Sequence, residues 1–280
     1  MFKYITLEKK VGQTPLSCAE AYRTLHPELA GVPMAYAGRL DPMASGKLLV
    51  LLGDECKHQA NYHGLDKEYE FSVLLGIESD SQDVMGRLSV YKGDGNQLSE
   101  RLRLGQAPQS GLEESLTSVA QDFIGKIELP YPIFSSKTVQ GKPLHTWTME
   151  GRLNEIDIPT KESEIFELEF TKLETIERND MVKQALEKVN SVPPVTELRK
   201  ALGNDFRRVD VRKDWDQILN DNSLPNEYQI AHFRCVASSG TYMRTLAQAI
   251  AKKLGTTGLA WHIHRTKIGK FSNGSWVKLF

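Results

Sequence analysis

The residue of this chain best placed to do chemistry is Asp41, in the segment AYAGRLDPMASG that begins at Ala35. Gly38 lets the backbone turn tightly or approach a ligand closely. Pro42 restricts Asp41 to an extended conformation. A continuous apolar run at 48–52 follows and predicts a buried strand. The pattern therefore predicts a carboxylate on a loop that the core braces, a common position for a reacting group.

Two other interpretations of this segment compete with a reactive carboxylate. Asp-Pro pairs are common turn formers, so the motif alone also fits an ordinary turn. A phosphate-binding loop does not fit, because that motif has the spacing G-x-x-x-x-G-K followed by Ser or Thr. Here seven residues separate Gly38 from Gly46, and Leu48 follows Lys47.

Composition and charge narrow the class of protein. The chain has 280 residues, 40% of them hydrophobic and 25% charged, with a formal net charge of −1. This charge gives no global attraction to nucleic acid, so a polyanion would have to be bound by a local patch of cations. Cys18, Cys56 and Cys235 lack the spacing of a zinc site or a disulfide framework, which predicts a cytoplasmic protein. There is no signal-peptide core and no membrane-length apolar run.

Hydrophobic periodicity predicts the elements that must position Asp41. Apolar residues alternate from Tyr69 to Leu75, which predicts a strand over 67–76. From Leu112 to Phe123 they recur at helical spacing, and Gly125 can cap that helix. We also expect strands at 2–8, 166–170, 233–237 and 259–271, helices at 15–25 and 240–254, and a polar loop at 91–111. Long strands mixed with a few helices, without an internal repeat, favour an α+β fold.

Residues 177–228 differ in character from the rest of the chain. They are charged, contain SVPPV at 191–195 and show two short helical patterns between two strand-like segments. This arrangement predicts a helical insertion at the tip of a strand pair. A solvated helical face would carry similar charges, so the two interpretations stay open. The segment is locally basic, with Arg199, Lys200, Arg207, Arg208, Arg212 and Lys213 against Asp205 and Asp210.

Six segments spread over most of the chain form a more specific pattern. They are KKVGQTP at 9–15, AYAGRLDPMASG, KEYEF at 67–71, LPYPIFSSKTVQGKPLHTW at 129–147, SSGTYMRTLAQAIAKKLG at 238–255 and HRTKIGKF at 264–271. In this order they resemble the TruB family of tRNA pseudouridine synthases. The resemblance runs from about Lys9 to Phe271 and is interrupted mainly by the segment at 177–228.

The resemblance implies a fold, an activity and a partner. It implies one pseudouridine synthase catalytic domain over residues 1–280, with a mixed, largely antiparallel central sheet, flanking helices and an RNA-binding cleft. The implied reaction is isomerisation of uridine to pseudouridine, at position 55 in the T loop of tRNA, without a metal or cofactor. The expected partner is the T arm of tRNA, and we expect a monomer. The alternatives are a synthase for another RNA site and a non-catalytic tRNA-binding chaperone.

The resemblance also implies three catalytic residues. Asp41 would be the catalytic aspartate, acting by attack at the sugar C1′ or by deprotonation at C2′, and the sequence leaves both routes open. Arg244 would pair with Asp41 and stabilise its ionised form. Tyr69 would stack on the extruded uracil. Without the resemblance, Tyr69 would be assigned to the core of its strand and Arg244 to an exposed helix face.

Further positions match the family near the substrate, some with departures. The matched substrate-binding residues are Lys9, Gly12, Tyr36, Arg39, Tyr242 and Ile263. Tyr36 stands where the family usually has a histidine that helps to hold the flipped T-loop nucleotides. Arg39 replaces the usual Thr or Ala, and the resulting GRLD is similar to the aspartate motif of the RluA and RsuA families. The GTYMRT and KEYEF segments favour TruB.

Two remaining features bear on ligands and domains. His262 and His264 alternate onto one face of an expected strand, but no carboxylate or cysteine lies at matching spacing, so we expect no metal site. The sequence ends at Phe280, soon after the last matched motif. We therefore expect no C-terminal PUA domain, and we expect the segment at 177–228 to serve instead as an auxiliary tRNA contact.

Overall fold

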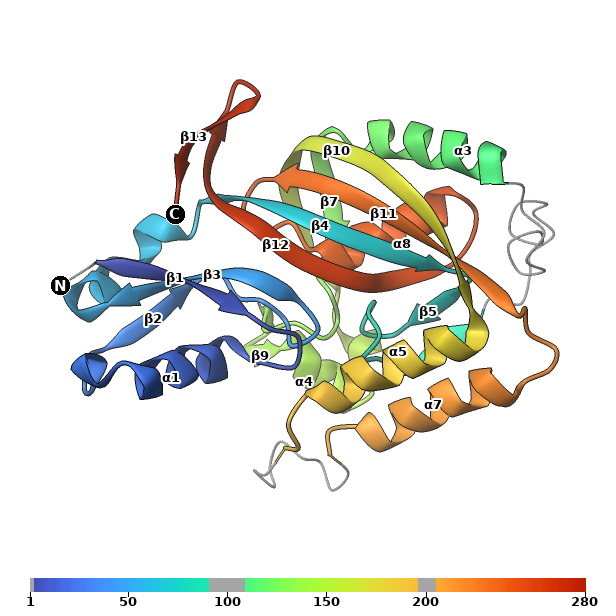
Figure 1. Ribbon diagram of the computed structural model, residues 1–280, viewed down its shortest axis with the longest axis horizontal. Helices are drawn as coiled ribbons and strands as arrows, with labels where there is room; N and C mark the ends of the chain where they lie inside the picture. The colour runs from blue at the N-terminus through green and yellow to red at the C-terminus, as the bar shows by residue number, and fades with distance from the viewer. Residues whose placement is uncertain (1–2, 91–108, 196–204) are drawn as a thin grey trace.

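A computed structural model describes residues 3–90, 109–195 and 205–280 of the chain. Its main feature is a nine-stranded mixed sheet, in which only β3 and β12 pair in parallel (Figure 1). The spatial order is β1 (Tyr4–Lys9), β3 (Ser45–Leu52), β12 (Gly258–Ser272), β4 (Asp66–Leu75), β11 (Glu227–Ala237), β10 (Thr160–Glu177) and β7 (Gly125–Pro130). At the margins, β2 (Met34–Ala37) pairs with β3, and β13 (Ser275–Leu279) pairs with β12.

The described helices flank this sheet, which confirms the predicted α+β class. They are α1 (Pro15–Leu25), α3 (Gln109–Asp122), α4 (Leu144–Met149), α5 (Arg178–Ser191), α7 (Arg208–Asn220) and α8 (Met243–Lys253). Two small hairpins, β5 (Ile77–Ser79) with β6 (Leu88–Val90) and β8 (Thr138–Val139) with β9 (Lys142–Pro143), lie outside the main sheet. Three short 3-10 helices, η1 (Pro27–Leu29), η2 (Gly53–Tyr62) and η3 (Leu153–Glu155), complete the described elements. No described helix is both long and apolar enough to cross a membrane.

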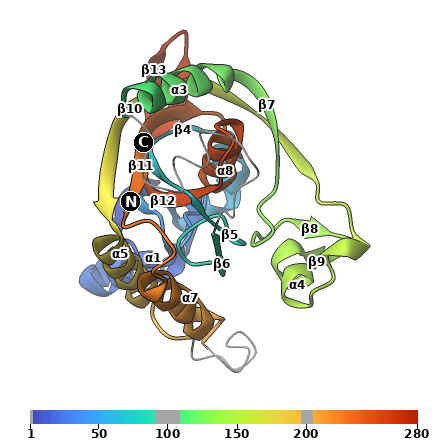
Figure 2. The same cartoon turned by 90° about the vertical axis from the view of Figure 1, so that its right-hand side faces the viewer.

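The main core lies between the sheet and α8. Figure 2 shows the sheet curving around this helix, which packs on β4 and β12. Leu246 and Ile250 of α8 are fully buried, as expected for apolar residues spaced four apart on a helix. They belong to the same cluster as Phe71 of β4 and Phe233 of β11, whose rings stack with centroids 5.3 Å apart. This core anchors the C-terminal end of β4 and the start of α8.

A smaller layer at the N-terminal end supports the loop that carries Asp41. Residues 48–51 of β3 are fully buried, as the apolar run predicts. Helix α1 begins at Pro15 after a capping box, in which Thr14 and Ser17 each bond the backbone N–H of the other. Cys18 of α1 packs against the apolar face of β1 and β3. Asp41 lies in the short loop between β2 and β3.

Helices α5 and α7 come between β10 and β11 in the order of the chain. The two strands pair to their ends, where Glu177 faces Glu227, and α5 starts at the next residue (Figure 1). The helices pack on each other and bury Met181 and Trp215 against the main core. The C-terminal end of α5 lies beside Gly12, which has φ +88°, because a Cβ there would lie 2.3 Å from the Ser191 carbonyl oxygen. Gly12 in turn contacts the Asp41 loop, since its N–H donates to the Pro42 carbonyl oxygen.

Most expected elements agree with the structure, with shifted ends. Helix α1 covers the predicted 15–25, whereas α8 starts at Met243, because a turn at 239–240, in which Gly240 has φ +91°, and the extended Tyr242 precede it. The loop expected at 91–111 lies mostly outside the described residues, and its last three residues belong to α3. Strand β10 is much longer than the expected 166–170, because its polar outer positions hide the alternation in the sequence.

Candidate active site

An open cleft with a volume of about 1450 Å³ lies beside the Asp41 loop. Its walls come from strands β2, β4 and β12, from the Asp41 loop, and from segments 81–85, 134–145, 192–195, 206–208 and 238–244. Cationic side chains outnumber carboxylates among the lining residues, although the whole chain is nearly neutral. They are Arg39, Lys67, Arg207, Arg208, Arg244 and Arg265, against Asp41 and Asp83. Lys67, Arg208, Arg244 and Arg265 are buried, so the excess gives the cleft a positive potential rather than a row of exposed phosphate contacts.

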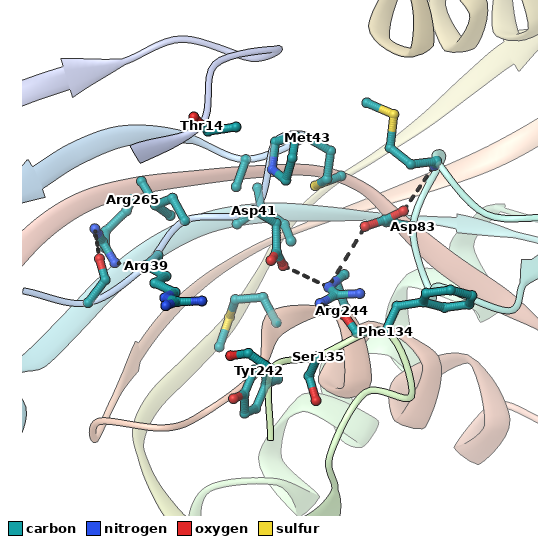
Figure 3. Close-up of a pocket in the computed structure, with 18 of the residues that line it drawn as sticks. Thr14, Arg39, Asp41, Met43, Asp83, Phe134, Ser135, Tyr242, Arg244 and Arg265 are labelled. Carbon is teal, nitrogen blue, oxygen red and sulfur yellow. Dashed lines mark hydrogen bonds and ion pairs between the residues drawn. The ribbon is translucent and has the colours of Figure 1, made fainter. Parts of the chain in front are cut away.

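Asp41 and Arg244 form an ion pair in this cleft. The Arg244 Nε and an Asp41 carboxylate oxygen lie 2.8 Å apart, without the in-line geometry of a hydrogen bond (Figure 3). The Asp41 side chain is 43% exposed, whereas that of Arg244 is only 5% exposed. The buried Arg244 guanidinium therefore pairs with the Asp41 carboxylate, which is accessible from the cleft. The carboxylate is free to meet a substrate from the cleft side.

The guanidinium of Arg244 is fixed by several partners besides Asp41. It donates hydrogen bonds to the carbonyl oxygens of Ser81, at 2.8 Å, and Phe134, at 3.3 Å. Asp83 lies 3.8 Å from its Nε on the other side (Figure 3). Burial raises the pKa of Asp83, and the neighbouring Arg244 opposes that rise. Of the two carboxylates beside Arg244, only that of Asp41 is accessible from the cleft.

The loop that carries Asp41 is held from one side by the N-terminal motif. Lys9 is fully buried and donates hydrogen bonds to the carbonyl oxygens of Ala44 and Lys10. The Gly12 N–H donates to the Pro42 carbonyl at 2.8 Å. The sequence predicts substrate binding for Lys9, but its burial assigns it to the loop instead. Desolvation lowers its pKa to about 8.

Arg265 of β12 holds the same loop from the other side. Its guanidinium is 1% exposed and donates to the carbonyl oxygens of Lys47 at 2.7 Å, Gly38 at 3.2 Å and Arg39 at 3.5 Å. Both flanks of Asp41 are thus attached to buried cations. Arg265 lies in the matched HRTKIGKF segment, but its residue type and spacing alone do not mark it as part of the site.

Tyr69 and Ile263 lie on neighbouring strands at the floor of the cleft. Tyr69 of β4 lines the cleft and is 9% exposed, and it also belongs to the main core. Tyr69 is therefore both a core residue and a residue that the cleft reaches. Ile263 of β12 faces Phe71 in the strand register and also lines the cleft.

The remaining expected substrate-binding residues lie on the cleft walls. Tyr36 of β2 is a half-buried lining residue, and Arg39 in the Asp41 loop is an exposed one. Tyr242 precedes α8, and its ring contacts Tyr131 edge to face with centroids 5.5 Å apart. Burial raises the pKa of Tyr242. Figure 3 shows Arg39 to the left of Asp41 and Tyr242 below it.

Lys67 is a further cleft residue that the sequence analysis did not identify as part of the site. Its ammonium group donates to the Leu65 carbonyl and, at 3.4 Å, to the Ser239 hydroxyl. Desolvation, aided by the nearby Arg265, lowers its pKa to about 8. Lys67 opens the matched KEYEF segment, so that motif contained the available signal. No sequence signal marks Asp83 as part of the site, because it lies outside every matched segment.

The histidines on β12 do not join a metal cluster. His262 and His264 share a strand face, with rings 6.3 Å apart, and His264 contacts the Ser45 hydroxyl at 2.9 Å. Within the described residues, no group of three or more histidine, cysteine or carboxylate side chains is arranged to hold a metal ion.

The cations of the segment at 177–228 are largely paired with carboxylates. Arg208 is 6% exposed and bonds Asp205 and the carbonyl oxygens of Val192 and Pro193. Arg207 pairs with Asp80, and Lys213 lies 3.8 Å from Asp210. Arg199 and Lys200 lie outside the described residues. Arg208 is thus unavailable to a phosphate, and the expected basic surface is weaker than the sequence predicts.

Comparison with known proteins shows the class to which this fold and cleft belong. The model of the TruB family pseudouridylate synthase N-terminal domain matches residues 29–186, more than half of the chain. The fold resembles a chain in the crystal structure of a Cbf5-Nop10-Gar1 complex, with a TM-score of 0.51 and 15% identity, over 96% of this chain and 50% of that one. The protein has the fold of a pseudouridine synthase.

Individual relatives narrow the assignment. The chain is 26% identical over 267 residues to tRNA pseudouridine synthase B of Caldicellulosiruptor saccharolyticus, covering 95% of this chain and 67% of that protein. It is also 26% identical over 252 residues to tRNA pseudouridine synthase 4 of Saccharomyces cerevisiae, covering 81% of this chain and 58% of the relative. The chain thus spans only part of the length of both proteins. It belongs to the TruB family of pseudouridylate synthases.

Proposed function

We propose that this protein converts uridine to pseudouridine in tRNA, with Asp41 as the residue that acts on the sugar. The observation that carries this proposal is the accessible Asp41 carboxylate on the buried Arg244, 2.8 Å away, in a cleft whose charged lining residues are mostly cations. The names of the relatives support tRNA as the substrate. We infer that the target lies in the T arm, at position 55, and that the protein acts as a monomer.

The reaction is an isomerisation that balances without a second reactant. The bond between C1′ and N1 of the uridine breaks, the base turns, and a new bond forms between C1′ and C5. The hydrogen of C5 is lost, and N1 gains a proton. Asp41 can start this either by attack at C1′ or by removal of a proton from C2′. Both routes need an ionised carboxylate, which the adjacent guanidinium favours.

The cleft also suits the handling of an extruded base. A base in folded RNA must leave its stack to reach a recessed carboxylate, which costs a few kcal/mol. Tyr69 and Ile263 at the cleft floor offer an aromatic and an aliphatic surface for that base. Buried Arg265 and Lys9 keep the Asp41 loop in one position, so little reorganisation is needed when RNA binds.

Mapping of modified nucleotides tests this proposal. Purified protein is incubated with an unmodified tRNA transcript and with an isolated T-arm hairpin, and pseudouridine is located by carbodiimide treatment and primer extension. We expect one new pseudouridine, at position 55, in both RNAs. A transcript with cytidine at that position serves as the control and should stay unmodified. Modification at another uridine would support a different RNA site, and tight binding without any pseudouridine would support the chaperone alternative.

A further inference from the structure

The facing ends of α5 and α7 form one wall of the cleft. Residues 192–195 follow α5, and residues 206–208 lie at the start of α7, and all of them line the same cavity as Asp41. The catalytic chemistry described above uses none of these residues. We call residues 192–195 together with 205–207 the α5–α7 wall.

Phe206 is an exposed aromatic residue in this wall. It is 37% exposed, although it lines the cleft, whereas most large apolar residues of the protein are buried. In the described part of the chain, no aromatic ring or cation stacks on it. The Phe206 side chain is therefore partly free to contact a ligand that enters the cleft.

The backbone presents Phe206 in an unusual conformation. Asp205, Phe206 and Arg207 have φ values of +50°, +50° and +69°. Residues other than glycine rarely adopt positive φ, and each such residue costs of the order of 1 kcal/mol or more. Three in succession persist only if their surroundings hold them in place.

The structure shows what holds this turn. On one side, the Asp205 carboxylate accepts the Val195 N–H at 3.1 Å and pairs with Arg208. On the other side, Arg207 pairs with Asp80 and lies 4.4 Å from the centre of the Phe134 ring. Phe206 is therefore fixed between two anchored residues, and its ring is preorganised for a partner in the cleft.

We propose that Phe206 stacks on an unpaired RNA base next to the flipped uridine, so that the α5–α7 wall forms the second side of the RNA-binding cleft. The inference rests on the proposed function for its ligand. An aromatic platform beside cations is the usual means of holding a nucleotide without reading its sequence, because every base has a π-face. The paired state of Arg207 and Arg208 makes stacking, rather than phosphate contact, the contribution of this wall.

Binding measurements with three substitutions test the proposal. Affinity for a fluorescent tRNA is measured by anisotropy for Phe206→Ala, Phe206→Leu and Phe206→Trp. Because base stacking is worth about 1–3 kcal/mol, we expect Phe206→Ala to weaken binding by about 5- to 150-fold. Phe206→Leu, which has no ring to stack, should weaken binding nearly as much as Phe206→Ala. Phe206→Trp should bind within about threefold of the wild type. Leu279→Ala, which shortens an exposed apolar side chain on β13, is the matched control and should change nothing.

Two further readouts separate stacking from other roles. The salt dependence of binding should keep its slope in Phe206→Ala, because no phosphate contact is lost. An abasic nucleotide beside the target uridine should weaken binding to the wild type but have little further effect on Phe206→Ala. Wild-type affinity in Phe206→Ala, or a Phe206→Trp variant that is folded and as weak as Phe206→Ala, would overturn the inference. Additive effects of the abasic site and Phe206→Ala would do the same.

The outcome is independent of the catalytic claim. Binding and its coupling to the abasic site are measured without turnover, so they report on Phe206 even if no pseudouridine forms. Conversely, product formation by the wild type with unaltered binding in Phe206→Ala would leave the proposed function intact and reject only the stacking role. Thermal unfolding of each variant checks that the α5–α7 wall is still folded.

Discussion

At the scale of single residues, the site is the buried Arg244 guanidinium between two carboxylates that differ in exposure. Arg244 contacts Asp41 at 2.8 Å and Asp83 at 3.8 Å, and only Asp41 is accessible from the cleft. Two backbone carbonyls fix the plane of the guanidinium. This arrangement sets the direction of the Asp41 carboxylate as well as its charge, which a simple cation would not do.

Arg244→Lys should therefore be a damaging change although it keeps the charge. A lysine ammonium cannot bond both carbonyl oxygens and Asp41 from one plane. Hydrogen bonds to charged groups contribute about 1.5–3 kcal/mol, so we expect the single-turnover rate to fall by about 10- to 100-fold with RNA affinity nearly unchanged. The rate is measured at saturating enzyme on a tRNA transcript.

A matched control for this change exists outside the cleft. Arg234 of β11 pairs with Glu68 and Glu167 on the sheet, so Arg234→Lys makes the same chemical change away from Asp41. We expect the control to turn over at the wild-type rate. Equal rates for Arg244→Lys and the wild type would show that the geometry of the ion pair is not needed.

Tyr69 shows where sequence reasoning reaches its limit at this scale. Alternation in β4 correctly predicts that Tyr69 and Phe71 point to the same face of the strand. The alternation cannot predict that Tyr69 lines the cleft and Phe71 does not, because this depends on which segments cover each position. Loop 38–44 and the start of α8 surround Tyr69, and both come from distant parts of the chain.

At the scale of elements, the Asp41 loop is positioned by β1 and β12 rather than by its own sequence. Lys9 ends β1, Arg265 lies in β12, and both donate to carbonyls of residues flanking Asp41. The two strands lie on either side of β3 in the sheet. The loop is thus attached to three strands, which explains how a short irregular segment can hold a reacting group.

Lys9→Met should slow the chemical step without weakening RNA binding. The substitution keeps a similar volume but leaves the Ala44 carbonyl without its donor, an unsatisfied buried group that costs about 1–3 kcal/mol. The loop can relieve this only by moving, and Asp41 moves with it. The check is the single-turnover rate together with tRNA affinity. As a control, Lys10→Met removes an adjacent, exposed lysine and should leave the rate unchanged. A wild-type rate in Lys9→Met would show that Lys9 does not position the Asp41 loop.

Helix α5 is attached to the sheet through a lysine, which makes stability depend on pH. Lys188 donates to the Trp261 carbonyl at 2.7 Å and lies 3.7 Å from the ring centre. Burial lowers its pKa to about 7 from an ordinary 10.5. Between these pH values the unfolded chain binds more protons, so this lysine's contribution to stability is complete above about pH 10.5 and is lost as the pH falls through about 7.

Lys188→Met should therefore gain stability relative to the wild type at low pH. Methionine carries no proton, so the difference in unfolding free energy should favour the variant most at about pH 6 and diminish steadily toward about pH 10. Urea unfolding at a series of pH values measures it. Lys183→Met, on an exposed position of the same helix, should show a pH-independent difference. A pH-independent difference for Lys188→Met would contradict the assigned burial effect.

At the scale of the whole molecule, the sequence predicts the elements and the family but not their assembly. The α+β class, strand β4, helix α1 and the location of Asp41 on a loop before a buried strand all follow from local patterns. The sheet order, in which β12 inserts between β3 and β4, does not, because it depends on pairing between residues about two hundred positions apart. Arg265 and Asp83 join the site only through this assembly.

Charge shows the same division between local pattern and assembly. The sequence correctly indicates that a nearly neutral protein needs a local cationic patch, and the cleft supplies one. It overstates the free positive charge at the start of α7, because Arg207 and Arg208 line the cleft but are paired with Asp80 and Asp205 in the folded chain. Counting cations in a segment ignores carboxylates that come from elsewhere in the sequence.

The central claim is that the Asp41 carboxylate drives formation of pseudouridine in bound tRNA. It is tested most directly with tRNA labelled by tritium at C5 of its uridines, because formation of the new bond at C5 releases that hydrogen to water. Wild-type protein should release tritium from one uridine per tRNA. Asp41→Asn keeps the shape of the side chain and removes its charge, so it should bind the same tRNA within about threefold and release tritium at least about 10³-fold more slowly. Release by Asp41→Asn at the wild-type rate would contradict the account.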